Sequence, residues 1–127
     1  MIEQKTTNPA MIIGDDKKPI KELREELART VRTAKELKIP TIILFEGWGA
    51  SGKGYMIEKL IAELDPRGYK VYSIKEPVGE ETRYPMLKRF WEKIPSAGNI
   101  SIFDRSWYRE VSIARVEDEL TKKIVDR

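Results

Sequence analysis

The hydrophobic residues of this chain change their spacing several times, and each change marks a different element. Between residues 20 and 39 they recur every three or four positions, which predicts an N-terminal amphipathic helix with one apolar stripe: Ile20, Leu23, Leu27, Val31, Ala34 and Leu37. Pro40 ends this pattern, because proline disfavours helical geometry in the residue before it. Residues 1–19 show neither a helical nor a strand period, and we interpret them as an irregular N-terminal arm.

Three short apolar runs have the length and composition of β-strands. Residues 41–46 begin with TIILF, a continuous run that is typical of a strand buried on both faces of a parallel sheet. Residues 70–74 (KVYSI) alternate, and residues 100–104 (ISIFD) are again apolar, so we predict strands there too.

Helical spacing returns between and after these strands. It predicts a helix that ends before Pro66 and Gly68, with apolar positions at Met56, Ile57, Leu60, Ile61 and Leu64. A further helix is predicted over residues 84–94, and the tail over residues 111–127 is expected to be helical. Strand, helix and strand in this order form a βαβ unit.

The segment from Gly47 to Lys53 has the GxxxxGK spacing of a phosphate-binding loop, and it follows a predicted strand and precedes a predicted helix. Glycines let successive backbone N–H groups face a phosphate, and Lys53 adds a mobile positive charge. The alternative is a glycine-rich turn with a solvent-facing lysine. The predicted phosphate- or nucleotide-binding residues are Gly47, Gly49, Ala50, Ser51, Gly52, Lys53 and Gly54.

Asp104 directly follows the apolar strand ISIF, where a P-loop protein commonly places a carboxylate that holds Mg²⁺ or its waters. We therefore predict Asp104 as a catalytic residue and metal ligand. The alternative is that Asp104 caps the next helix, since FDRS is also typical of a helix start. Gly54 replaces the Ser or Thr that usually gives its hydroxyl to Mg²⁺, so the metal needs another ligand, for which Glu46 is a second candidate.

Basic residues near these motifs are further candidates. Arg105 and Arg109 are four apart, so on a helix both guanidinium groups face one cleft, and the alternative is two solvated surface arginines. Trp107 and Tyr108 between them are either base-stacking or core aromatics. Arg89, paired with Lys88, is predicted to bind phosphate, although a solvated helix face would have the same pattern. An acidic group precedes this pair: Glu76, Glu80 and Glu81.

Composition narrows the chemistry. The 127 residues suffice for one domain, and 24 Lys plus Arg against 21 Asp plus Glu give a net charge of only +3, which does not by itself indicate nucleic acid. We expect no nucleic-acid partner, because no basic and aromatic pattern beyond Arg105 to Arg109 supports one. The sequence has no Cys and no His, so a metal must bind oxygen ligands, which favours Mg²⁺ as the cofactor. No apolar run approaches the roughly 18 residues that span a bilayer, so we expect no membrane partner and a cytoplasmic location.

Four segments together resemble the polyphosphate kinase 2 family, over residues 40–117: FEGWGASGKG, EPVGEETRYPMLKRFW, IPSAG and FDRSWYREV. The resemblance implies a Mg²⁺-dependent kinase that moves a phosphoryl group between inorganic polyphosphate and a nucleoside mono- or diphosphate, with AMP, ADP, ATP or guanine equivalents as nucleotides. It also implies that Lys53 cradles phosphates, Asp104 serves the metal, and Arg105 and Arg109 neutralise developing charge. We expect a homo-oligomer.

The chain departs from the family's pattern in two places. The family has Asp at the third position of the loop, where this chain has Gly49, and its catalytic domain continues past FDRSWY through a lid. We therefore expect residues 40–127 to form the N-terminal part of a P-loop kinase domain. The expected fold is an incomplete three-layer α/β domain of the P-loop NTPase type, in which the third of about three parallel strands lies between the first two.

Two other functions remain open at this point. Thymidylate kinases share the order of FEG, glycine loop, EP segment and DR pair, so a nucleoside monophosphate kinase is one alternative. The other is a non-catalytic phosphate-binding or regulatory module, which Gly49 and the short length favour.

Overall fold

The computed structural model describes residues 18–125, with side chains described up to residue 119. Helices and strands alternate in the order α1 (Ile20–Glu36), β1 (Thr41–Phe45), α2 (Lys53–Ile61), β2 (Tyr69–Ser73), the 3₁₀ helix η2 (Gly79–Arg83), α3 (Lys88–Trp91), β3 (Ile100–Asp104) and α4 (Trp107–Val125). Almost all of the predicted arm over residues 1–19 lies outside the described residues. The predicted α/β organisation is confirmed.

The three strands form one parallel sheet in the order β1-β3-β2, so the third strand lies between the first two as expected. The register places Asp104, the last residue of β3, level with Phe45 at the end of β1 and Ser73 at the end of β2. The carboxyl ends of all three strands therefore meet at one edge of the sheet, where open α/β sheets bind ligands.

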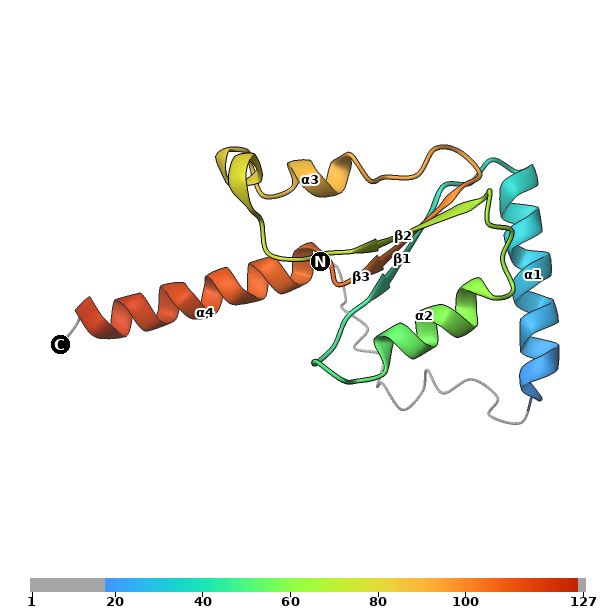
Figure 1. Cartoon of the computed structure of the whole chain (residues 1–127), viewed down its shortest axis with the longest axis horizontal. Coiled ribbons are helices and arrows are strands. Elements are labelled where there is room, and N and C mark those ends of the chain that lie inside the picture. Colours follow the sequence, from blue (N-terminus) through green and yellow to red (C-terminus); the bar gives the residue numbers. More distant parts are fainter. Residues whose placement is uncertain (1–17, 126–127) are drawn as a thin grey trace, which may run out of the picture.

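Helices cover both faces of this sheet, which makes three layers (Figure 1). On one face, Ile57 of α2 packs with Ile100 and Ile102 of β3, and Val31 of α1 packs against the same cluster. On the other face, Phe90 of α3 packs with Phe103 of β3. Adjacent residues of β3 point to opposite faces, so this one strand contributes to both halves of the core.

Burial in the sheet differs from the prediction for the first strand. Residues 100–103 of β3 are buried, whereas β1 is only half-buried and Ile42 is 39% exposed. The difference follows from strand order, because β1 has a described neighbour on one side only. An apolar run therefore indicated a strand here but not a fully buried one.

The predicted helix over residues 84–94 is wrong in extent, because α3 spans only Lys88–Trp91. Tyr84 is extended, with φ −104° and ψ 159°, as expected for a residue that precedes a proline. The last helix begins earlier than predicted, at Trp107, because the Ser106 hydroxyl accepts a hydrogen bond from the Tyr108 N–H at 3.4 Å. Ser106 thus has the N-cap position that the sequence left open for Asp104.

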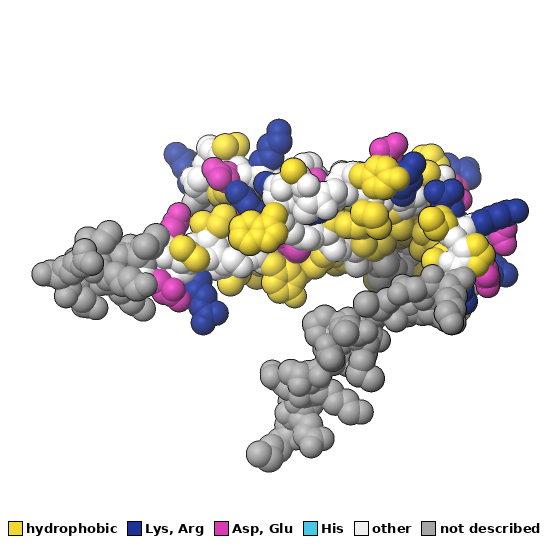
Figure 2. Space-filling view, turned by 90° about the horizontal axis from the view of Figure 1, so that it is seen from below, with side chains coloured by type: hydrophobic (Ala, Val, Ile, Leu, Met, Phe, Trp, Pro, Cys, Tyr) yellow, Lys and Arg dark blue, Asp and Glu magenta, His cyan; other side chains and the backbone are white. Residues whose placement is uncertain are grey.

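Many apolar side chains of the described residues remain exposed. The stripe of α1 is half-buried at Leu27, Val31 and Ala34 but exposed at both ends, and Trp48 of the loop is 89% exposed. Figure 2 shows hydrophobic side chains along the middle of one face, with charged side chains toward its rim. Among the described residues there is no helix that is long and apolar enough to cross a membrane.

Candidate phosphate-binding site

The glycine loop connects β1 to α2 through a backbone that needs glycine at two positions. Gly47 and Gly52 have φ angles of 146° and 88°, and Ala50 between them has a φ of 59°. A Cβ atom at position 47 would also lie only 3.1 Å from the Ser51 Oγ. Residues with a side chain rarely adopt these backbone conformations. The glycines therefore allow the chain to turn between the strand and the helix.

Lys53 is the first residue of α2, and its side chain lies across the loop. The Nζ donates hydrogen bonds to the carbonyl oxygens of Gly47 at 2.9 Å and Trp48 at 2.7 Å, and to the Ser51 Oγ at 3.3 Å. The ammonium group is therefore held over the loop at the positive end of a nine-residue helix. This is the placement that the sequence predicted for a phosphate-binding lysine.

A cavity of about 520 Å³ lies between the loop and the carboxyl ends of β2 and β3. We call it the loop cavity, and it is lined by Gly49, Ala50, Ser51, Gly52, Lys53, Gly54, Ser73, Ile74, Lys75, Asp104 and Arg105. Eight of the predicted site residues are thus brought together in one place. Lys75 was missed, although its position just after a strand is the same argument that selected Asp104.

Asp104 is half-buried at the end of β3, and its Oδ1 atom is buried with no hydrogen-bond partner among the described residues. A carboxylate oxygen left without a donor suits a hard cation such as Mg²⁺. The described residues contain no cluster of three or more acidic side chains that could hold a metal. Asp104 is therefore a candidate metal ligand, and it is the one carboxylate among the described residues that line this cavity.

Arg105 lies at a bend between β3 and α4, with the left-handed φ angle of 67°. Its backbone N–H donates a hydrogen bond to the Phe45 carbonyl at 2.9 Å. Arg105 lines both the loop cavity and a second cavity of about 530 Å³. We call the second one the α4 cavity, lined by Glu46, Gly47, Trp48, Gly49, Arg105, Arg109, Ser112, Ile113, Val116 and Glu117. The two cavities meet at Gly49 and Arg105.

Arg109 lines the α4 cavity together with Arg105, so the two arginines share a cavity as expected. The expected reason is wrong, because α4 begins after Arg105 and the pair does not lie on one helix. An Nη of Arg109 lies 3.4 Å from a carboxylate oxygen of Glu76, which is exposed. This exposed ion pair contributes little free energy, so it leaves Arg109 able to turn toward an anion in the cavity.

Arg89 is placed differently from the other basic candidates. Its side chain is only 11% exposed, donates to the Lys75 carbonyl at 2.7 Å, and forms ion pairs with Glu110 and with Glu81, the latter at 3.8 Å. Arg89 does not line the loop cavity or the α4 cavity. These contacts connect α3 to α4 and to the segment after β2, while phosphate binding by Arg89 stays a prediction.

The aromatic pair after Arg105 divides between core and surface. Trp107 packs edge-on against Phe90 and Phe103, with ring centroids 5.8 Å and 6.1 Å away. Tyr108 is 57% exposed. Trp107 is therefore a core residue, which is one of the two interpretations that the sequence left open.

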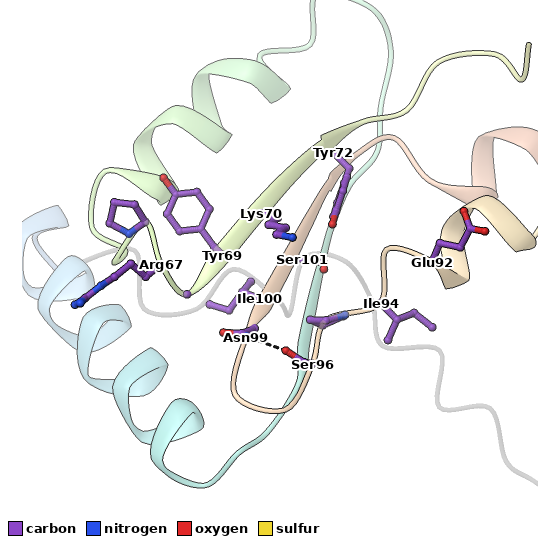
Figure 3. A pocket seen from close by; sticks show the side chains of 13 residues that line it. Arg67, Tyr69, Lys70, Tyr72, Glu92, Ile94, Ser96, Asn99, Ile100 and Ser101 are labelled. Carbon is purple, nitrogen blue, oxygen red and sulfur yellow. Dashed lines mark hydrogen bonds between the residues drawn. The ribbon is translucent and has the colours of Figure 1, made fainter.

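A cavity of about 330 Å³ at the opposite end of the strands is a weaker candidate for the site (Figure 3). It lies where β2 and β3 begin, and the residues that line it include Tyr69, Lys70, Asn99 and Ser101. Asn99 and Ser96 bond to each other there at 2.6 Å. The glycine loop follows the carboxyl end of β1, at the other edge of the sheet. This cavity is therefore at the opposite end of the strands from the proposed phosphate-binding residues.

A parallel sheet with a glycine loop, a lysine at the start of the next helix and an aspartate at the end of the neighbouring strand is the arrangement of a P-loop-like fold. The family model that matches the chain is narrower: it is described as Polyphosphate kinase 2 (PPK2) and matches residues 13–127. The chain belongs to the polyphosphate kinase 2 family.

Curated relatives and solved structures agree with this family. The chain is 41% identical over 106 residues, 84% of its length, to the polyphosphate:AMP phosphotransferase of Acinetobacter johnsonii. It is 32% identical over 114 residues, 90% of its length, to ADP-polyphosphate phosphotransferase 3 of Rhizobium meliloti. A crystal structure from Pseudomonas aeruginosa assigned to polyphosphate kinase 2 superposes on 77% of the chain with a TM-score of 0.68 and 37% identity.

These relatives are much longer than the chain. It spans 22% of the Acinetobacter protein, 40% of the Rhizobium protein and 22% of the Pseudomonas structure. The similarity therefore covers only part of the length of these relatives.

Proposed function

We propose that this chain binds the phosphates of inorganic polyphosphate and of a nucleotide, and takes part in phosphoryl transfer between them. The observation that carries the proposal is the meeting of the glycine loop, Lys53, Asp104 and Arg105 around one cavity at the carboxyl edge of the sheet. Phosphoryl transfer needs little covalent chemistry from the protein and depends on positioning and charge stabilisation, so a site without His or Cys suffices.

The residues of the site have separate tasks in this proposal. Backbone N–H groups of the loop and the Lys53 ammonium bind the phosphate oxygens, and Lys75 adds positive charge on the β2 side of the same cavity. Arg105 and Arg109 neutralise charge that develops on the transferring group. Asp104 would hold Mg²⁺, whose chemistry at such a site is to neutralise phosphate charge.

The names of the relatives guide the choice of substrates. They are phosphotransferases named for polyphosphate with AMP, ADP or GDP. The purified chain should be assayed for transfer from polyphosphate to AMP, ADP and GDP, with ATP as an alternative donor. Transfer that prefers polyphosphate supports the proposal, whereas transfer from ATP alone would favour the thymidylate-kinase-like alternative.

Phosphate binding at the loop can be tested separately with tripolyphosphate in a calorimeter. Lys53→Ala should weaken binding by about 10- to 150-fold, because a hydrogen bond to a charged group contributes about 1.5–3 kcal/mol. Lys59→Ala is the matched control, since Lys59 is exposed on the same helix and does not line either cavity. If Lys53→Ala and Lys59→Ala bound tripolyphosphate with equal affinity, the assignment of the glycine loop as the phosphate-binding site would be wrong.

A second candidate function is phosphate binding without turnover. It is favoured by one feature of the site, because neither Gly49 nor Gly54 offers a metal ligand and Asp104 is the single clear carboxylate of the loop cavity. Binding of tripolyphosphate together with no measurable transfer would identify this function. Measurable transfer from polyphosphate would exclude it.

Location and assembly belong to the same proposal. We place the protein in the cytoplasm, because the nucleotide pools that such a reaction uses are cytoplasmic. A homo-oligomer stays a prediction, which light scattering of the purified chain would contradict if it gave a monomer mass at micromolar concentration.

A further inference from the structure

Two polar residues are buried in the described part of the chain, Ser101 and Ser106, and Ser106 has no exposed surface. The Ser106 hydroxyl donates a hydrogen bond to the Oε1 atom of Glu46, sixty residues earlier in the chain. The Ser106 Oγ atom also accepts a hydrogen bond from the Tyr108 N–H at the start of α4. Ser106 therefore ties the end of β1 to the beginning of α4.

Arg105 lies between two residues that contact the end of β1. On its N-terminal side Asp104 is in register with Phe45, its own N–H bonds the Phe45 carbonyl at 2.9 Å, and on its C-terminal side Ser106 bonds Glu46. Its φ angle of 67° is uncommon for a residue with a side chain and costs free energy, so surrounding contacts must impose it.

The left-handed conformation determines where the arginine is placed. If residue 105 continued β3, its side chain would point to the face of the sheet opposite that of Asp104, because side chains alternate along a strand. The bend instead keeps Arg105 beside Asp104 in the lining of the loop cavity and also in the lining of the α4 cavity. The position of Arg105 between the two cavities depends on the bend.

We propose that Glu46 and Ser106 are a pair of positioning residues that hold Arg105 in its left-handed conformation for phosphate binding. The proposal rests on phosphate binding at the loop. It gives Glu46 a role different from metal binding, because its Oε1 atom accepts the Ser106 hydroxyl. The pair acts through Arg105, so neither residue is expected to contact phosphate itself.

The first test is a double-mutant cycle read by calorimetric titration of the full chain with tripolyphosphate. Ser106→Ala should weaken binding about tenfold in the parent chain but less than about twofold when Arg105→Ala is already present, because residues that act through one another are not additive. Ser101→Ala is the matched control: Ser101 is also buried, and its hydroxyl bonds the Lys93 carbonyl at 2.7 Å. It should change affinity less than about twofold.

The proposal would be overturned if Ser106→Ala lowered the affinity equally with and without Arg105→Ala. It would also be overturned if Ser101→Ala lowered the affinity as much as Ser106→Ala. The Tm of both serine variants shows whether a loss follows general destabilisation. If the parent chain itself fails to bind tripolyphosphate, the proposed function fails, and a crystal structure of the Ser106→Ala variant decides the positioning role alone. We expect a negative φ at Arg105 there, and a φ still near 67° would refute the role.

The second test separates positioning from metal binding at Glu46. Glu46→Gln keeps an oxygen that accepts the Ser106 hydroxyl but removes the charge, so tripolyphosphate affinity should stay within about threefold, whereas Glu46→Ala should behave like Ser106→Ala. Titration of Mg²⁺ in the presence of tripolyphosphate provides the comparison. If Glu46→Gln weakened Mg²⁺ binding as much as Asp104→Asn does, Glu46 would be a metal ligand and the proposal would be wrong.

Discussion

Replacing Gly49 with Asp should strengthen Mg²⁺ binding at the loop, and the structure shows that the site can accept the change. Gly49 is not among the glycines with positive φ, and a Cβ atom built on it meets no other atom within 4 Å. It lines the loop cavity, as Asp104 does. A carboxylate at this position would therefore lie in the lining of the same cavity as Asp104.

The size of the effect follows from the number of charged ligands. One added charge-assisted contact contributes about 1.5–3 kcal/mol, which corresponds to about 10- to 150-fold tighter Mg²⁺ binding. Repulsion between the new carboxylate and Asp104 in the metal-free protein works in the same direction, because bound Mg²⁺ removes it. The gain should therefore be larger at low ionic strength, where this repulsion is screened less.

The assay is a titration of Mg²⁺ into the chain with tripolyphosphate bound, followed by measurement of phosphoryl transfer from polyphosphate to AMP. Gly49→Asn is the matched control, because it has nearly the same size and no charge. Tighter Mg²⁺ binding and faster transfer in the Asp variant alone would support the reasoning. Equal behaviour of the two variants, or brisk transfer by the parent chain with no gain in the Asp variant, would refute it.

Two further predictions concern stability and pH. Phe103 has no exposed surface, so Phe103→Ala should lower the free energy of unfolding by about 3–5 kcal/mol in urea denaturation, and a loss below about 1 kcal/mol would contradict the assigned core. The hydrogen bond from the Arg67 side chain lowers the pKa of Asp65 from 3.8 to about 2. A depressed carboxyl pKa adds stability that is present above pH 3.8 and is lost as the pH falls toward about 2. In an NMR titration, Arg67→Ala should raise this pKa toward 3.8, and an unchanged value would exclude Arg67 as the cause.

The parts of the fold that sequence predicted are those set by local pattern. Apolar runs and one alternating segment located all three strands to within one residue, and the glycine spacing located the loop, because these patterns depend on neighbouring residues only. The ends of elements were less accurate. Residues 84–94 contained helical spacing, but the extended Tyr84 before a proline left only a short α3.

The parts of the site that sequence missed depend on contacts between distant segments. Arg89 follows a lysine, and the sequence left phosphate binding and a solvated helix face open for it. Its side chain is instead only 11% exposed and pairs with Glu110, which is 21 residues further along the chain. Arg105 and Arg109 suggested a shared helix, but the left-handed bend at Arg105 separates them. Neither the ion pair of Arg89 with Glu110 nor the bend at Arg105 can be predicted from the pattern of neighbouring residues in the sequence.

The register of β3 explains how the described strands bring the proposed phosphate-binding residues together. β3 pairs with both other strands, and its last residue, Asp104, is level with Phe45 and Ser73. The glycine loop leaves from β1 and Lys75 follows β2, so both reach the cavity beside Asp104 without any further strand. In the proposed function, phosphate binding therefore depends on the three described strands and their register, whereas the number of metal ligands depends on the residues at positions 49 and 54. The two properties can consequently be lost separately, so a phosphate-binding chain with weak Mg²⁺ binding is a coherent outcome of this sequence.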